Sequence, residues 1–222
     1  MGKIIVIEGT DSSGKATQAA LLYEYLKKDN NNVIKLSFPD YDSDSSKLIK
    51  MYLNGDFGKT ADSVSPEIAS VFYAADRYAS FKTKWQEFYE KDDSIIVFDR
   101  YVTSNMVHQA AKIDDFEKKE AYLDWVYNLE YEIFGLPKPD MVIFLKMPPE
   151  KAELLMMERP NKITNEAKKD IHESDLPYLR KCYENALFVS KKYAWHEISC
   201  TNGDIIKSIE DIHREICGEI NG

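Results

Sequence analysis

The chain has 222 residues, 44% of them hydrophobic and 30% charged, and a formal net charge of −9 at pH 7. This length and composition suit one soluble domain over residues 1–222 with a full core, and the acidic balance disfavours a nucleic-acid binder, which usually carries a basic face. No apolar stretch approaches the roughly 20 residues that span a bilayer, and the first residues lack the pattern of a secretory signal, so we expect neither a membrane partner nor export.

Four short apolar runs rich in Val and Ile and a fifth, weaker run predict strands, and the stretches between them predict helices. The strands are expected at residues 3–8, 33–37, 94–98, 141–145 and, more weakly, 195–199. The helices are expected at residues 17–28, 65–90, 115–134, 150–158, 174–192 and 205–220. Nearly continuous apolar strands are typical of parallel sheets. Their alternation with helices predicts a doubly wound α/β fold, with a five-stranded parallel sheet and helices on both faces.

The first predicted strand leads directly into a glycine-bounded loop and a helix start, which is the context of a phosphate-binding P-loop. Gly9 and Gly14 permit backbone angles that other residues avoid, so successive N–H groups can converge on one anion. Lys15 adds a positive charge at the helix N-terminus, where the helix dipole already favours phosphate. Ala16 occupies the position of the usual hydroxyl residue. The segment predicts a P-loop NTPase-like fold.

Two further groups of polar residues follow along the chain. Tyr73 and Arg77 are four residues apart and share a helix face, which suits a flat base with a carbonyl acceptor, although core aromatics at this spacing are common. Asp99 and Arg100 end the third predicted strand. Ligands of open α/β sheets bind beyond the carboxyl ends of the strands, so this pair and the P-loop should face one crevice. There Asp99 could bind a hydrated metal ion or a hydroxyl and Arg100 a phosphate; the alternative is a structural ion pair.

Residues 159–173 are polar and charged, with little apolar periodicity. Two interpretations of this segment stay open. It is either a solvated loop or a short mobile lid that closes over a phosphate donor.

The cysteines bear on the cellular compartment. Cys182, Cys200 and Cys217 are too widely spaced for a disulfide framework or a zinc site, and they indicate a reducing cytoplasm. We therefore expect a cytoplasmic protein in which each cysteine is a small apolar residue.

Together these segments resemble thymidylate kinase (dTMP kinase), a family of P-loop nucleoside monophosphate kinases. The matching segments cover almost the whole chain and are residues 9–18, 38–39, 73–77, 99–101, 104–105 and 137–140. An acidic residue inside the P-loop, combined with an Asp-Arg-Tyr strand end, is fairly specific to this family. The resemblance implies that the protein phosphorylates dTMP to dTDP, with ATP as the donor and Mg²⁺ as the cofactor.

The resemblance also implies a role for each matching residue. ATP would be bound by Gly9, Thr10, Asp11, Ser12, Ser13, Gly14, Lys15, Ala16 and Thr17. The acceptor dTMP would be bound by Asp11, Phe38, Pro39, Tyr73, Arg77, Arg100, Ser104, Asn105, His108 and Gln109. Within this set, Asp11 would meet the 3′-hydroxyl and Arg100 the phosphate. Tyr73 would stack on thymine, with Phe72 as the alternative if the register shifts by one, and Arg77 would bond thymine O4.

The resemblance assigns catalysis to Lys15, Arg100, Asp99 and Arg159. Three departures from the family pattern qualify this assignment. Ala16 lacks the hydroxyl that usually touches magnesium, so the metal would be held through phosphates and water, with Asp99 in its outer shell. Tyr41 stands where the family often has arginine. Ser12 stands where some members have a basic residue; members without it place arginines in the lid, and Arg159 is the candidate here.

Two alternative functions stay open. A deoxynucleoside kinase also has a P-loop and an acidic-Arg strand end, but its acid would act as a base toward a 5′-hydroxyl. A non-catalytic nucleotide-binding module is suggested by Ala16 and by the sparse cations of the lid. Because family members are commonly homodimers, the expected partners are ATP, dTMP and a second copy of the chain.

Overall fold

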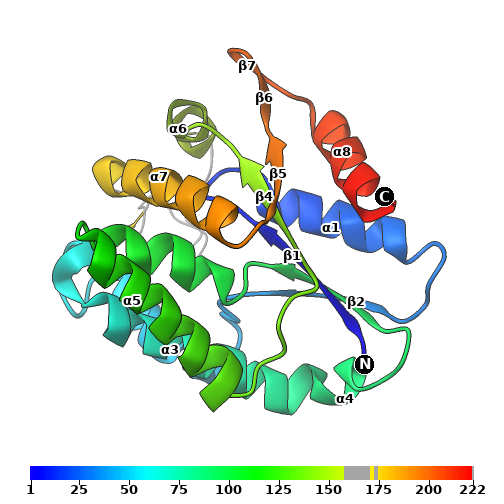
Figure 1. Cartoon of the computed structure of the whole chain (residues 1–222), viewed down its shortest axis with the longest axis horizontal. Helices are drawn as coiled ribbons and strands as arrows, with labels where there is room; N and C mark the ends of the chain where they lie inside the picture. The colour runs from blue at the N-terminus through cyan, green and yellow to red at the C-terminus, as the bar shows by residue number, and fades with distance from the viewer. Residues whose placement is uncertain (158–170, 173–174, 222) are drawn as a thin grey trace.

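The computed structural model describes residues 1–157, 171–172 and 175–221. A five-stranded parallel sheet crosses the centre of the molecule (Figure 1). Its strand order is β2-β3-β1-β4-β5. The strands are β1 (Lys3–Glu8), β2 (Val33–Ser37), β3 (Ile95–Asp99), β4 (Met141–Lys146) and β5 (His196–Ser199). The predicted α/β class and all five predicted strands are confirmed.

Helices cover both faces of this sheet. They are α1 (Lys15–Leu26), α2 (Lys47–Leu53), α3 (Pro66–Ser80), α4 (Gln86–Tyr89), α5 (Phe116–Tyr127), α6 (Pro149–Met157), α7 (Leu176–Lys192) and α8 (Ile209–Asn221). In Figure 1, α1 and α8 lie on one side of the sheet, while α3, α4 and α5 lie on the other. Among the described residues, no helix has the length and hydropathy needed to cross a bilayer.

Alternate residues of the central strand enter two separate cores. Ile4 and Val6 of β1 pack in a cluster that includes Trp85 and residues of α5 and α7. Ile5 and Ile7 pack in a second cluster, with residues of α1, α6 and α8. Because side chains of a strand alternate between faces, one continuous apolar run supplies both cores.

Two of the predicted helices are interrupted by π turns. The segment predicted at 65–90 consists of α3, a π turn at Phe81–Trp85 and α4. The segment predicted at 115–134 consists of α5 and a π turn at Asn128–Ile133. A π turn inserts an extra residue into a helix and often occurs at functional sites.

The C-terminal helix begins later than predicted. Residues 201–206 form a small antiparallel hairpin of β6 (Thr201–Asn202) and β7 (Ile205–Ile206). The helix α8 then starts at Ile209, where Ser208 Oγ accepts a hydrogen bond from the Asp211 N–H at 3.1 Å. The predicted lid at 159–173 lies outside the described residues, except for residues 171 and 172.

Candidate active site

A cavity of about 670 Å³ opens at the carboxyl ends of β1 and β3, where open α/β sheets bind their ligands. It brings together most of the residues predicted from the sequence. The P-loop contributes Asp11, Ser12, Ser13, Gly14, Lys15, Ala16 and Thr17. The acceptor side contributes Phe38, Pro39, Tyr73, Arg77, Asp99, Arg100, Ser104, Asn105, His108 and Gln109. The predicted catalytic residue Arg159 lies outside the described residues and stays a prediction.

The P-loop has the backbone shape of an anion-binding loop. Ser12 and Gly14 have φ angles of 60° and 90°, in the left-handed region. A Cβ on Gly9 would lie 2.6 Å from Ser13 Oγ and 3.1 Å from the carbonyl oxygen of Leu145, so only glycine fits there. Lys15 begins α1, and its Nζ donates to the carbonyl oxygen of Thr10 at 2.5 Å. The loop thus holds its lysine against its own backbone.

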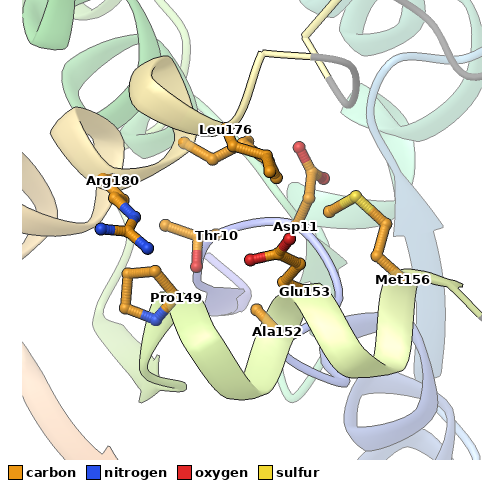
Figure 2. Close-up of a pocket in the computed structure, with 9 residues that line it drawn as sticks. Thr10, Asp11, Pro149, Ala152, Glu153, Met156, Leu176 and Arg180 are labelled. Atoms are coloured by element: carbon orange, nitrogen blue, oxygen red, sulfur yellow. The ribbon is translucent and has the colours of Figure 1, made fainter.

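The two predicted P-loop residues Gly9 and Thr10 do not line the large cavity. The N–H of Gly9 donates to Glu8 Oε1 at 2.9 Å, so this donor is already used. Thr10 instead lines a smaller pocket on the other side of the loop, together with Asp11 (Figure 2). Figure 2 shows that side chains from two helices complete this pocket. They are Pro149, Ala152, Glu153 and Met156 of α6, and Leu176, Leu179 and Arg180 of α7.

Arg100 links the P-loop to the end of β3. Its backbone has a φ of 68° and its N–H donates to the carbonyl oxygen of Ile7 at 3.2 Å. Its Nη2 donates to Asp11 Oδ1 at 2.5 Å, and its Nη1 lies 3.7 Å from Glu8 Oε1. Burial disfavours the charged guanidinium, but Asp11 and Glu8 outweigh burial and raise the pKa of Arg100. The guanidinium is therefore a permanent cation in the cavity wall.

Glu8 is a site residue that the sequence analysis missed. This carboxylate is fully buried at the end of β1. It accepts hydrogen bonds from Thr103 Oγ1 at 2.6 Å and from Ser104 Oγ at 2.8 Å. The signal available in the sequence was a charged residue at the end of an otherwise apolar strand, because a carboxylate buried there needs hydrogen-bond partners.

His108 supports Arg100 at Nη1, the guanidinium nitrogen that does not bond Asp11. Its Nε2 accepts from Arg100 Nη1 at 2.8 Å, which places the proton of the neutral imidazole on Nδ1. Burial and the neighbouring Arg100 hold the pKa of His108 well below its usual value. His108 therefore stays neutral and accepts from Arg100 rather than repelling it.

Asp99 has an acceptor atom with no partner among the described residues. Its Oδ2 lies 3.4 Å from Ser37 Oγ, while its Oδ1 is buried and unbonded within the part of the chain that the structure describes. A carboxylate oxygen suits Mg²⁺ or its coordinated water. The described residues hold no group of three potential metal ligands from His, Cys, Asp and Glu. Asp99 thus fits a metal held mainly by phosphates and water.

The cavity wall that contains Arg77 and Asn105 is built on a buried ion pair. Arg77 Nε and Nη2 donate to Glu130 at 2.5 and 2.6 Å, and Asn105 Nδ2 donates to the same carboxylate at 2.8 Å. Burial disfavours the charge on Arg77, but Glu130 raises its pKa. Tyr73 lines the cavity, whereas Phe72 packs against Phe57 with ring centres 5.8 Å apart. Tyr73, rather than the alternative Phe72, thus lines the cavity.

The remaining wall extends past the N-terminus of α1, and sequence reasoning did not identify it. Gln18, Ile206, Lys207, Ile209 and Ile212 line this end of the cavity, with Met147 and Leu155. The Gln18 Nε2 donates to the carbonyl oxygen of Ile209 at 2.9 Å, which ties α1 to the start of α8. The apolar side chains suit a flat nucleobase beside the phosphate-binding loop. Tyr41, Leu53 and His172 line the acceptor side and were likewise not predicted as ligand contacts.

Comparisons with known proteins agree on one family. A family model described as thymidylate kinase matches residues 7–216. A thymidylate kinase from Plasmodium falciparum is 31% identical over 224 residues, covering 99% of this chain and 90% of the relative. A probable thymidylate kinase from Thermococcus gammatolerans is 31% identical over 221 residues, covering 98% and 95%. The solved structure of thymidylate kinase from Candida albicans matches with a TM-score of 0.73 at 23% identity, covering 99% of this chain and 91% of that chain.

The matched range includes each part of the cavity described above. It contains the loop from Gly9 to Thr17, the wall around Arg77, and the strand end at Asp99 and Arg100. The sheet order and the cavity agree with the match, which extends over nearly the full length of the chain. From its sequence, its fold and the residues around its cavity, the chain belongs to the thymidylate kinase family.

Proposed function

We propose that this protein is an ATP:dTMP phosphotransferase that converts dTMP to dTDP. One observation carries the proposal: Lys15 of the P-loop and Arg100 at the end of β3 line the same cavity. Each is a cation suited to one of two phosphate-bearing ligands. A single cavity with two phosphate-binding cations is what direct transfer between two nucleotides requires.

The two ends of the cavity suit different nucleotides. We assign the end formed by α1, β7 and α8 to the adenine of ATP, because apolar side chains follow directly from the P-loop there. We assign the opposite end to dTMP, where Tyr73 offers an aromatic face and Arg77 a donor. Phe38 follows directly after β2; it is buried and packs against Phe98, so it shapes this wall.

Phosphoryl transfer requires little covalent chemistry from the protein. Its main task is to hold two anionic reactants in line and to neutralise the charge that develops between them. Lys15 would bind the donor phosphates, and Arg100, held by Asp11 and His108, would bind the phosphate of dTMP. No general base is needed, because a phosphate monoester is already a nucleophile at neutral pH.

We propose Mg²⁺ as the cofactor, bound mainly through ATP. When bound, magnesium supplies positive charge to the phosphates. Asp99 is the residue of this chain that fits its outer shell, because its buried Oδ1 lacks a partner among the described residues. The lid around residues 159–173 and its Arg159 stay predictions about the donor side.

A coupled ADP-release assay with dTMP, dUMP, AMP, GMP and thymidine tests the proposal. We expect ADP release with dTMP well above that with AMP, GMP or thymidine. Phosphorylation of thymidine alone would identify a deoxynucleoside kinase instead. Binding of ATP without ADP release in the presence of dTMP would identify a non-catalytic nucleotide-binding module.

We also propose that the protein is a homodimer that pairs through α3. Ile68, Val71, Ala75 and Tyr78 are exposed on α3 and repeat at intervals of three and four residues, the spacing of a helix–helix contact face. Light scattering should give the mass of two chains, and Val71→Glu should give one. A monomeric wild-type protein at micromolar concentration would contradict this assignment.

A cytoplasmic location is proposed on the state of the cysteines. All three are free thiols, and Cys182 and Cys200 are buried, as expected where disulfides do not form. Recovery of the protein in the soluble cytosolic fraction of its source cells would support this location. Recovery only from a secreted fraction would contradict it.

A further inference from the structure

Glu130 holds together the base-side wall of the cavity, which contains Arg77 and Asn105. It lies in the π turn at Asn128–Ile133 and is fully buried. Its two oxygens accept three hydrogen bonds, two from Arg77 and one from Asn105. Arg77 and Asn105 both line the cavity, whereas Glu130 does not. One buried carboxylate thus fixes two side chains that face the proposed acceptor base.

The neighbours of Asn105 determine which way its amide points. Its Nδ2 lies 2.8 Å from Glu130 Oε1 and 3.3 Å from the carbonyl oxygen of Ser70. Both of these partners are acceptors, so the amide nitrogen must face them and the amide oxygen must face away. No described residue donates a hydrogen bond to Oδ1 of Asn105. Asn105 therefore offers the cavity an acceptor.

Arg77 offers the opposite polarity. A guanidinium has five N–H donors and no acceptor. Those on Nε and Nη2 that face Glu130 are used, and Nη1 donates to the carbonyl oxygen of Tyr101 at 3.3 Å. The N–H groups left over remain donors under all conditions. The wall therefore presents one donor residue and one acceptor residue side by side.

We propose that Glu130 is a positioning residue that selects the base by fixing this polarity. Thymine carries an acceptor at O4 and a donor at N3–H, which complement Arg77 and Asn105 respectively. Cytosine carries an amino donor at position 4 and an acceptor at N3, so both pairings would be repulsive. Without Glu130, the amide of Asn105 keeps only the longer 3.3 Å hydrogen bond to the carbonyl oxygen of Ser70, so the polarity of the wall is held less firmly. This inference rests on the proposed function, because it takes dTMP as the acceptor.

The wild-type protein can be tested with two nucleotides that differ only at this edge. They are dTMP and 5-methyl-dCMP, which share the methyl group, the sugar and the phosphate. We expect kcat/KM to favour dTMP by at least ~100-fold, because a site built for specific hydrogen bonds strongly rejects a mismatched partner. Equal use of both nucleotides, within a few-fold, would overturn the inference.

The variant Glu130→Gln tests the residue itself. It keeps the side-chain shape but replaces one acceptor with a donor, so we expect the preference for dTMP to fall by at least ~10-fold. The KM for ATP should stay unchanged, because Glu130 contacts only the base-side wall. Glu132→Gln is the matched control: it makes the same change in the same π turn, at an exposed carboxylate that accepts from Lys138 at 2.9 Å. The control should keep the full preference.

A second variant covers the case in which Glu130→Gln does not fold. Asn105→Ala removes the acceptor while leaving the Arg77–Glu130 pair intact, and it should also lower the preference for dTMP. An unchanged preference in a folded Glu130→Gln or in Asn105→Ala would refute the role given to Glu130. Absence of dTMP phosphorylation by the wild-type protein would instead refute the proposed function, so the two failures are distinguishable.

Discussion

Lys15 is folded onto its own loop, with Nζ donating to the Thr10 carbonyl oxygen and the side chain almost fully buried. A bound polyphosphate would replace this carbonyl with oxygens of higher negative charge. The ammonium group therefore has an internal partner that is neutral and easily exchanged. Charged phosphate oxygens form stronger hydrogen bonds with an ammonium group than a neutral carbonyl oxygen does.

Removal of this ammonium group should mainly affect the chemical step. We expect Lys15→Ala to lower kcat by at least ~100-fold, the range observed when one donor to a transition state is lost. Steady-state ADP release at saturating dTMP and ATP measures the effect. Lys3→Ala, at the exposed start of β1, the strand that leads into the P-loop, is the control and should turn over normally. A Lys15→Ala variant with nearly normal turnover would contradict the assignment.

Site residues that belong to a local sequence motif could be identified from the sequence. Those whose hydrogen-bond partners lie far away in the sequence were missed. Arg77 follows from its spacing to Tyr73, and Arg100 follows from its place after an apolar strand. Glu8 is bonded by Thr103 and Ser104, which lie 95 and 96 residues away. Glu130 is 53 residues from Arg77. Glu8 is marked only by its charge at the end of an apolar strand, and no local pattern marks Glu130, because the roles of both carboxylates arise when distant segments meet.

The junction between β1 and α1 depends on close packing around the first glycine of the loop. A methyl group at Gly9 would press against the carbonyl oxygen of Leu145 in β4, which cannot move aside as a flexible side chain could. Gly9→Ala should therefore lower the free energy of unfolding by ~1–3 kcal/mol, the usual cost of overpacking. Urea denaturation followed by circular dichroism measures this change.

The matched control for Gly9 lies in α8. A Cβ on Gly218 meets nothing within 4 Å, and the residue lies inside a helix. Gly218→Ala should raise the free energy of unfolding by ~0.5–1 kcal/mol, because alanine has the higher helix propensity. If Gly9→Ala and Gly218→Ala changed the free energy of unfolding equally, close packing at the loop would not be the cause of the loss in Gly9→Ala.

The helices and strands that could be predicted from the sequence are those with a clear pattern of apolar residues. The three inner strands, β3, β1 and β4, followed from continuous apolar runs because both of their faces are buried, whereas the edge strands β2 and β5 are only partly buried and β5 carried a weaker signal. The π turn at Phe81–Trp85 was not predictable, because one inserted residue leaves the composition of the helix unchanged. The helix α2 and the β6–β7 hairpin were missed, because elements this short carry too few residues to show a period.

Acid should destabilise the whole molecule through its buried histidines. Burial and the neighbouring Lys112 lower the pKa of His172 to about 3, from an ordinary value of 6.5. Between these two pH values the unfolded chain binds a proton that the folded chain does not. Stability therefore falls as the pH drops below about 6.5, by ~1.4 kcal/mol per pH unit for this one group. Above pH 6.5 the contribution of His172 to the free energy of unfolding is constant.

Urea titrations at pH 7, 6 and 5 measure this loss of stability. In His172→Gln the titrating group is absent, while an amide can still bond to the hydroxyl of Tyr52, the partner of His172 at 2.8 Å. The decline in unfolding free energy between pH 6 and pH 5 should be shallower in the variant by ~1.4 kcal/mol. Parallel curves for the two proteins would show that His172 titrates normally in the folded state.

The backbone bond from the Arg100 amide to the Ile7 carbonyl joins the two phosphate-binding halves across the middle of the sheet. Because this bond closes the ladder between two inner strands, the amide exchanges with deuterium only when the ends of β1 and β3 separate, and it should be well protected. Nucleotides that bind there would slow deuterium uptake in the surrounding loops but scarcely alter it at Arg100. The spacing between donor and acceptor would then be set by the folded scaffold before either substrate arrives.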